Sequence, residues 1–153
     1  MGESLRTTLM RWGFNLFPAF RRTGGRINHL SHDLKRAETV LPLNWKTRNY
    51  VGTIFGGSMF AAVDPVYMVM LIKLLGPEYV IWDKAATIRY RKPGRSTLRA
   101  SFHIEDEELL MIRRELERSD AIERTYQVEL VDSHGTVCAV IDKTLHFRKK
   151  RKD

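Results

Sequence analysis

The residue of this sequence best suited to chemistry is Asp64, the only charged side chain between Val51 and Ile72. In one continuous helix, its neighbours at offsets of three, four and seven would be apolar or nearly so: Gly57, Phe60, Tyr67, Met68 and Leu71. Apolar surroundings disfavour the charged form of a carboxylate, so Asp64 is a candidate general base or nucleophile. A second interpretation stays open, in which Asp64 is only the N-cap of a helix that begins at Pro65.

Two glycines, Gly56 and Gly57, stand at the start of the same apolar segment. Because glycine has no side chain, a ligand can approach its backbone, and the first N–H groups of a helix have no intrahelical partner. Such amides bind developing negative charge, and one donor aimed at an oxyanion is worth about 3 kcal/mol. Taken alone, the pair favours a simpler interpretation, a tight turn into the helix that binds no ligand.

Three basic side chains surround the turn at Pro93-Gly94: Arg91, Lys92 and Arg95. They could hold the phosphates of a nucleotide-like carrier through charge-assisted hydrogen bonds. The alternative, which such charges alone favour, is an ordinary solvated hairpin tip.

Histidine and cysteine give no sign of a metal or of a nucleophile. His29 and His32 lie in a predicted strand, where an offset of three places them on opposite faces, and no third ligand is evident. Cys138 is the only cysteine, lacks a Cys-His signature and is expected to be buried. We therefore expect no metal and no cofactor. Because nothing in the chain requires oxidation, we expect a cytoplasmic protein.

Hydrophobic periodicity predicts the elements that must position these residues. Helical spacing predicts helices at 3–22 and 57–75 and a short helix that begins at 105. Extended or alternating patterns predict strands at 26–34, 36–43, 82–90, 98–104, 122–130 and 137–147. Tight turns between alternating segments indicate antiparallel neighbours. The predicted fold class is therefore α+β, with an antiparallel sheet of five or six strands packed by one face on the apolar helix.

The first predicted helix has large apolar side chains at spacings of three and four: Leu5, Leu9, Trp12, Leu16 and Phe20. That pattern predicts an amphipathic helix, stopped by Gly24-Gly25, and we favour one that packs on the domain. The alternative is a helix that lies on a membrane surface, helped by the basic residues Arg21, Arg22 and Arg26.

The 153 residues carry a formal charge of +8, which suits anionic partners. Residues 1–50 hold nine basic and three acidic side chains, whereas residues 51–153 hold seventeen and fifteen. Five of those seventeen form the run 148–152, which we interpret as a solvated end. This uneven distribution does not fit a dedicated DNA-binding domain, so no specific nucleic acid partner is expected.

The apolar segment 51–72 is also long enough to cross a bilayer. It contains two glycines near its start and Asp64-Pro65 in its middle, and a carboxylate in mid-membrane is costly. We therefore expect a buried central helix rather than a transmembrane span.

The segment from Asn49 to Asp64 resembles the signature of hotdog-fold acyl-CoA thioesterases of the phenylacetate-pathway type. That family shows Asn, five residues, His-Gly-Gly, and then Asp on the central helix, seven positions after the second Gly. Four residues match this spacing: Asn49, Gly56, Gly57 and Asp64. Phe55 stands where the family has His, so any hydrogen bond from an imidazole is lost.

The strand Trp82-Asp83-Lys84 and the turn Pro93-Gly94 make the chain most similar to the uncharacterised, thioesterase-like DUF4442 branch. The resemblance runs from about residue 35 to 148. It implies a hotdog fold, an antiparallel five- to six-stranded sheet wrapped around a long central helix, here with an extra N-terminal helix. We expect an N-terminal amphipathic helix at 1–24, a hotdog domain at 25–148 and a basic C-terminal tail at 149–153.

The resemblance also implies a role for each matched residue. Asp64 would activate water or attack the thioester carbonyl, Gly57 with Gly56 would supply N–H groups to the oxyanion, and Asn49 would orient the nucleophile or water. In the family the carboxylate and the amides come from different subunits, so a homodimer or homotetramer is implied. Helix geometry agrees. Gly57 and Asp64 would lie about 10 Å apart along one helix, so one chain cannot easily place both groups on the same carbonyl.

The implied substrate is an acyl-CoA or a related acyl thioester, with CoA as part of the substrate. The residues expected to contact it are Phe55, Phe60, Tyr67 and Met68 for the acyl part and Arg91, Lys92 and Arg95 for the carrier phosphates. One alternative is a non-catalytic acyl- or lipid-binding hotdog protein, in which Phe55 marks a lost activity. Another is a peripheral membrane or nucleic-acid adaptor that uses the first helix and the basic tail.

Overall fold

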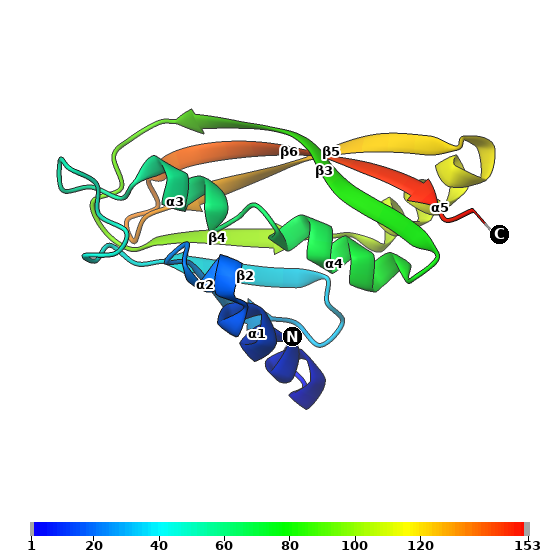
Figure 1. Cartoon of the computed structure of the whole chain (residues 1–153), viewed down its shortest axis with the longest axis horizontal. Coiled ribbons are helices and arrows are strands. Elements are labelled where there is room, and N and C mark those ends of the chain that lie inside the picture. The colour runs from blue at the N-terminus through cyan, green and yellow to red at the C-terminus, as the bar shows by residue number, and fades with distance from the viewer. Residues whose placement is uncertain (1, 152–153) are drawn as a thin grey trace.

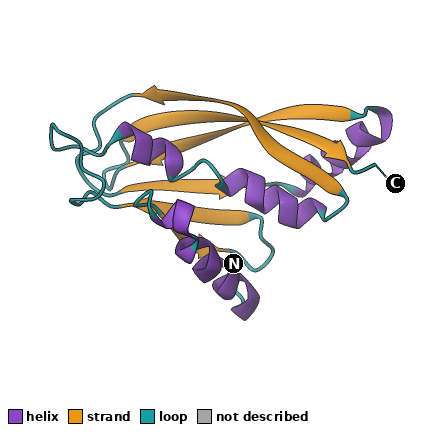
Figure 2. Cartoon of the chain, viewed as in Figure 1, coloured by secondary structure: helices purple, strands orange, loops and turns teal. Residues whose placement is uncertain are grey.

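One antiparallel sheet of six strands, in the order β1-β2-β4-β5-β6-β3, forms the frame of the protein. The computed structural model describes residues 2–151. The strands are β1 Arg26–Leu30, β2 Arg36–Leu41, β3 Tyr79–Tyr90, β4 Leu98–His103, β5 Ala121–Val131 and β6 Val137–Lys149. The helices are α1 Leu5–Leu16, α2 Pro18–Arg21, α3 Gly56–Ala61, α4 Val66–Leu75 and α5 Asp106–Arg118. Figures 1 and 2 show α3 and α4 lying along one side of the curved sheet. The predicted α+β class with an antiparallel sheet is confirmed.

The core lies between the sheet and the central helices. In β4 every second residue is buried, and α4 buries Tyr67, Met70 and Leu71. Apolar side chains of this size each contribute about 1.5–3 kcal/mol when they are fully buried. By length and composition the stretch Gly56–Leu75 could cross a membrane, with a mean hydropathy of 1.6, but half of that window is buried inside the protein. It is the core helix that the sequence predicted.

The central helix is not continuous, although the pattern predicted one helix at 57–75. It is interrupted between α3 and α4, because Pro65 has no N–H to donate to the preceding turn. The amide of Asp64 still donates to the carbonyl of Phe60 at 3.0 Å, and the next amide, that of Val66, donates to Val63 at 3.2 Å. The interpretation of Asp64 as an N-cap is wrong, since α4 has no side-chain cap.

A β-bulge in β3 changes which side chains face the central helix. The register with β6 shifts between Asp83 and Ala85. Before the bulge Ile81 faces inward, and Trp82 lies on the outer face, where its ring stacks on His146 with centroids 4.3 Å apart. An unbroken alternation from Trp82 onward, as the sequence suggested, does not occur. Asp83, two residues after Ile81, shares the inward face and pairs with the buried Leu145 of β6, and after the bulge Ala86 and Ile88 occupy that face instead.

Helix α1 closes one edge of the sheet. The side-chain amide of Asn15 donates to the carbonyl of Ile27 at 2.8 Å and accepts from its N–H at 2.7 Å. A carboxylate oxygen of Glu3 accepts the N–H of Leu30 at 2.8 Å. These contacts satisfy backbone groups of β1 that no strand pairs, whereas β3 lies at the opposite edge of the sheet.

The N-terminal helix packs on the domain through a different face from the one predicted. Four of the five predicted contact residues are exposed: Leu5 (79%), Leu9 (64%), Trp12 (55%) and Leu16 (58%). Only Phe20, which lies on α2 after a break at Pro18, is buried. Besides Glu3 and Asn15, the side chains turned to the domain are Met10 and Phe14, which pack against its core, while Thr7 is fully buried. The helix therefore turns its larger apolar side chains to solvent.

Candidate functional site

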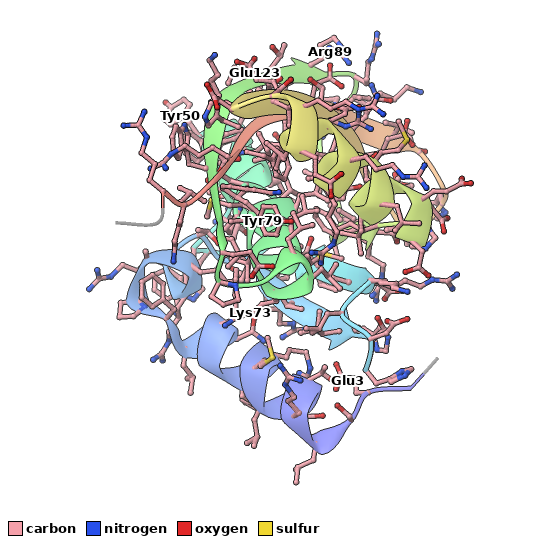
Figure 3. All side chains as sticks on the ribbon, turned by 90° about the vertical axis from the view of Figure 1, so that its right-hand side faces the viewer. Glu3, Tyr50, Lys73, Tyr79, Arg89 and Glu123 are labelled. Carbon is pink, nitrogen blue, oxygen red and sulfur yellow. The ribbon has the colours of Figure 1, made fainter. Side chains whose placement is uncertain are left out.

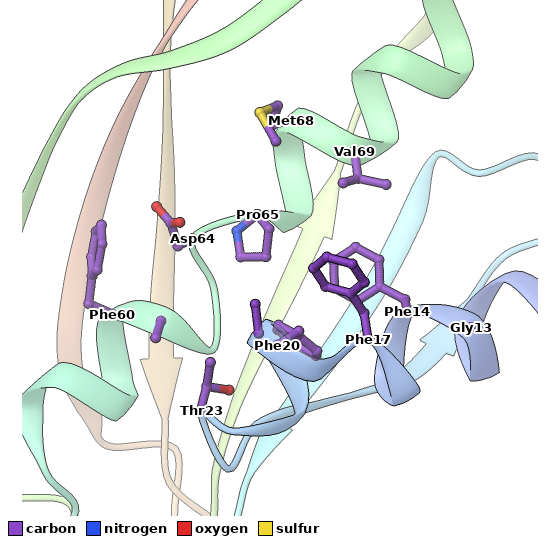
Figure 4. A pocket seen from close by; sticks show the side chains of 12 residues that line it. Gly13, Phe14, Phe17, Phe20, Thr23, Phe60, Asp64, Pro65, Met68 and Val69 are labelled. Carbon is purple, nitrogen blue, oxygen red and sulfur yellow. The ribbon is translucent and has the colours of Figure 1, made fainter.

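An apolar cavity of about 530 Å³ separates the N-terminal helices from the central helix. Phe14, Phe17 and Phe20 form one wall, and Phe60 and Met68 belong to the other. Figure 4 shows Asp64 on the loop that joins α3 to α4, on the same wall as Phe60 and Met68. Of the described residues that line this cavity, Asp64 is the only one with an ionisable side chain. The predicted proximity of Asp64, Phe60 and Met68 is therefore present.

Asp64 is not the unpaired acid that the apolar sequence context suggested. Its carboxylate accepts a hydrogen bond from the ammonium of Lys143, and the side chain keeps 38% of its surface exposed. A second carboxylate oxygen, on Asp83, lies 2.8 Å from the same ammonium. The ring of Phe60 lies 5.3 Å from this nitrogen, within the range of a cation–π contact.

Lys143 is the residue that holds this cluster together, and the sequence analysis missed it. Only 1% of its side chain is exposed, and a buried charge of this kind requires paired partners, which Asp64 and Asp83 supply. A signal was present in β6. Alternate residues of this strand, Ile141, Leu145 and Phe147, are buried, so a lysine at 143 interrupts an inward-facing apolar series.

Gly56 and Gly57 form the first turn of α3, where the backbone N–H groups have no intrahelical partner. Aromatic side chains lie against both glycines. A Cβ on Gly56 would stand 2.7 Å from the hydroxyl of Tyr90, and one on Gly57 would overlap the ring of Phe55. Close packing of these two rings is thus one physical reason for the glycine pair.

Asn49 organises the loop that precedes α3. Its side-chain oxygen Oδ1 accepts the N–H groups of Val51 at 3.1 Å and Thr53 at 3.0 Å. Its side-chain nitrogen Nδ2 donates to the Thr53 hydroxyl at 2.9 Å. A cleft of about 360 Å³ brings Asn49 together with Gly56, Arg91 and Lys92. The role of Asn49 in orienting a nucleophile stays a prediction.

Some of the predicted residues lie apart from one another. Arg95 is exposed and does not line the cleft with Arg91 and Lys92. Tyr67 lines neither cavity; it packs in the core, 5.1 Å from the ring of Phe102 and 5.0 Å from that of Tyr126. Met68, the next residue of α4, lines the cavity that holds Asp64, whereas Tyr67 packs against rings of the sheet, so its contact with substrate stays a prediction. Burial raises the pKa of the Tyr67 hydroxyl.

Within one chain, Asp64 and Gly56 line two different cavities. Cys138 is buried, as predicted, and burial raises the pKa of its thiol. Across residues 2–151, no three or more His, Cys, Asp or Glu side chains gather as metal ligands would.

A six-stranded antiparallel sheet around a central helix defines this protein as a member of the hotdog-fold class, and solved structures confirm it. The Pseudomonas aeruginosa protein PA5026, a probable thioesterase of unknown function, is similar over 98% of this chain and 100% of its own, with TM-score 0.84 and 20% identity. The Haemophilus influenzae thioesterase HI1161 is similar over 97% and 93%, with TM-score 0.69 and 14% identity.

The family assignment rests on sequence. The profile of the family described as "Domain of unknown function (DUF4442)" matches residues 6–147, so this chain belongs to the DUF4442 family. The predicted resemblance is thereby confirmed. No protein with a curated description matches the chain in sequence.

Proposed function

We propose that this protein hydrolyses acyl thioesters, with Asp64 as the base that activates water or as the attacking nucleophile. The observation that carries the proposal is the position of Asp64, the one ionisable side chain among the described residues around an apolar cavity of about 530 Å³. Such a cavity suits an acyl chain, and the carboxylate stands where a carbonyl at the end of that chain could reach it. The names of similar structures, a probable thioesterase and a thioesterase, support the same reaction.

In the general-base form of the reaction, Asp64 accepts a proton from water as the water oxygen attacks the thioester carbonyl. Backbone N–H groups of Gly57 and Gly56 would stabilise the oxyanion. The carbon–sulfur bond then breaks, and the thiolate takes up the proton. Lys143 is a positioning residue in this scheme, because its ammonium fixes the Asp64 carboxylate while Asp83 supplies a second negative charge. The reaction needs no cofactor beyond the CoA of the substrate.

The proposed site requires two chains. Asp64 and Gly56 line separate cavities in one chain, and β3 lies at a sheet edge that no other described strand of the chain pairs. Antiparallel pairing of β3 with the β3 of a second copy would bring the partner's central helix to the first one. We therefore propose a homodimer, or a tetramer built from such dimers, in which one chain gives the carboxylate and the other gives the amides.

The proposed substrate is an acyl-CoA. The support is the cleft beside Gly56, where Arg91 and Lys92 gather next to Asn49, since guanidinium and ammonium groups bind phosphate well. Arg95 on the same turn adds a third positive charge at longer range. Phe55, whose ring covers Gly57, would contact the acyl group near its carbonyl.

A non-catalytic acyl-binding protein is the second candidate function, and one observation favours it. Asp64 serves as a counter-ion for the buried Lys143, so its carboxylate already has a structural role that requires no catalysis. Phe55, which stands where the phenylacetate-type signature has histidine, points in the same direction.

The deciding experiment is a hydrolysis panel of acyl-CoA thioesters with wild type and Asp64→Asn. We expect the variant to lose at least about a hundredfold in rate, since a positioned base typically contributes that much. Asp120→Asn, which removes an exposed carboxylate, is the matched control and should keep wild-type rates. Equal rates for Asp64→Asn and wild type on the best thioester would contradict the proposal. An intact acyl ligand in native mass spectra, without turnover of any thioester, would favour the binding protein.

A further inference from the structure

The outer face of α1 carries an apolar stripe that no other part of the described chain covers. Its five residues are Leu5, Leu9, Trp12, Leu16 and Phe17, with 55–79% of each residue exposed. Figures 1 and 3 show that α1 lies at the outer boundary of the molecule, with side chains standing out from its far side. Single exposed apolar residues are common, but a continuous stripe on one helix marks an interaction surface. We call these five residues the α1 stripe.

Positive charge surrounds the α1 stripe. Arg6, Arg21 and Arg22 are exposed, and the sequence has no acidic residue between Glu3 and Asp33. Glu3 itself is turned inward, where it pairs with Arg11 at 2.8 Å and accepts the amide of Leu30. The segment 4–32, which carries the stripe, therefore contributes basic side chains and no carboxylate to this surface.

A second exposed aromatic residue continues this surface. Trp45 is 80% exposed and stands beside Leu16, Arg21 and Arg22 around a shallow hollow. The ammonium of Lys46, which lines the same hollow, lies 5.2 Å from the Trp45 ring. One exposed tryptophan and three cations thus gather beside Leu16, at one end of the α1 stripe.

We propose that the α1 stripe, together with Trp45 and the cations around it, docks on an anionic membrane surface. Leucine, phenylalanine and tryptophan side chains enter the boundary between headgroups and acyl chains, and arginine binds the lipid phosphates. A second copy of this chain is a poor occupant of the same face, because it would place Arg21 and Arg22 against like charges. The docking stands on this geometry and does not depend on hydrolysis.

The location of the surface has a consequence for substrate entry. Phe17 belongs both to the α1 stripe and to the lining of the cavity that holds Asp64. On a docked protein, an acyl chain could therefore move from the lipid layer past Phe17 into the cavity without crossing water. This route, unlike the docking, rests on the proposed function.

The test is co-sedimentation of the full chain with vesicles of phosphatidylcholine alone, or with about 30% phosphatidylserine. We expect binding to the anionic vesicles only, weakened by salt. The double variant Leu9→Glu/Trp12→Glu should reduce binding at least about tenfold, since apolar burial is lost and negative charge is added. Arg21→Ala/Arg22→Ala should reduce it about fivefold for each charge at low salt.

Leu110→Glu/Met111→Glu is the matched control, because both residues are exposed apolar side chains on α5. It should bind as wild type does, and so should a chain that ends at residue 149. Absence of binding to anionic vesicles, or equal binding by the α1 and α5 variants, would overturn the docking. Dissociation of an oligomer by Leu9→Glu/Trp12→Glu in sedimentation velocity, without vesicle binding by wild type, would instead assign the face to a contact between copies.

Discussion

At the scale of single residues, the charge arrangement around Lys143 decides what Asp64 can do. One buried ammonium contacts two carboxylates, so the cluster as a whole is negative by one charge. Of the two carboxylates, Asp64 is the more exposed and lines the cavity, whereas Asp83 lies on β3 of the sheet. The cluster therefore holds Asp64 in place at the edge of an apolar space.

Replacing Lys143 with methionine tests this arrangement. Loss of the ammonium leaves two partly buried carboxylates without their common partner, which costs about 1–3 kcal/mol. We expect a lower urea midpoint for Lys143→Met with an unchanged m-value. Lys84→Met is the control, because Lys84 and its partner Glu123 are about half exposed and such pairs contribute less than about 1 kcal/mol. Similar losses for both variants would contradict a larger contribution from the buried ammonium than from an exposed ion pair.

The sequence predicts which residues belong to the candidate site but not which side chains they contact. The spacing from Asn49 to Asp64 singles out the glycine pair, which lies in the first turn of α3, and Asp64, which lines the apolar cavity; their roles stay predictions. It did not pair Asp64 with Lys143, because the two are 79 positions apart and the contact depends on the curvature of the whole sheet. An inward-facing lysine in an apolar strand is visible in a sequence, but its counter-ions are not.

At the scale of elements, small local irregularities set which face each segment presents. Pro65 was visible and its effect on a long helix could have been predicted, whereas the bulge after Asp83 has no turn residue to mark it. The N-terminal helix shows a third case. Periodicity predicts this helix and its apolar stripe. The orientation of the helix on the sheet is set by the polar contacts of Asn15 and Glu3 rather than by the stripe.

Asn15 is the clearest of these anchors, and its removal has a local effect that can be measured. In Asn15→Ala the N–H and C=O of Ile27 lose their partner, which costs about 2 kcal/mol where water cannot replace the hydrogen bonds. We expect faster hydrogen exchange at Ile27 and in α1, with little change in β5 and β6. Asn28→Ala, at an exposed position of the same strand, is the control. Unchanged exchange at Ile27 would mean that α1 is held by its apolar contacts alone.

At the scale of the whole molecule, one edge of the sheet is covered by a helix and the other edge is open within the described chain. Helix α1 covers β1 with Asn15 and Glu3, whereas β3 presents its outer edge without such a cover from the described chain. Edge strands that remain open are sites of pairing with another chain. The exposed run of small residues at 85–87 in β3 leaves room for a second strand and helix. The proposed oligomerisation at β3 and the proposed docking at α1 therefore use opposite edges of the sheet and would not compete.

Lysine substitutions on β3 should prevent the proposed pairing of two copies of this chain, because charged side chains at a sheet edge oppose strand pairing. For Ala85→Lys/Ala86→Lys we expect sedimentation velocity to show monomers where wild type forms dimers or larger assemblies. Ala121→Lys, on the interior strand β5, is the control and should assemble normally. If Asp64 and the glycine amides act from different chains, the monomeric variant also loses thioester hydrolysis by at least about a hundredfold, as loss of a positioned catalytic group does. A folded monomer with wild-type hydrolysis would show that one chain carries a complete site, and that the open edge of β3 serves another partner.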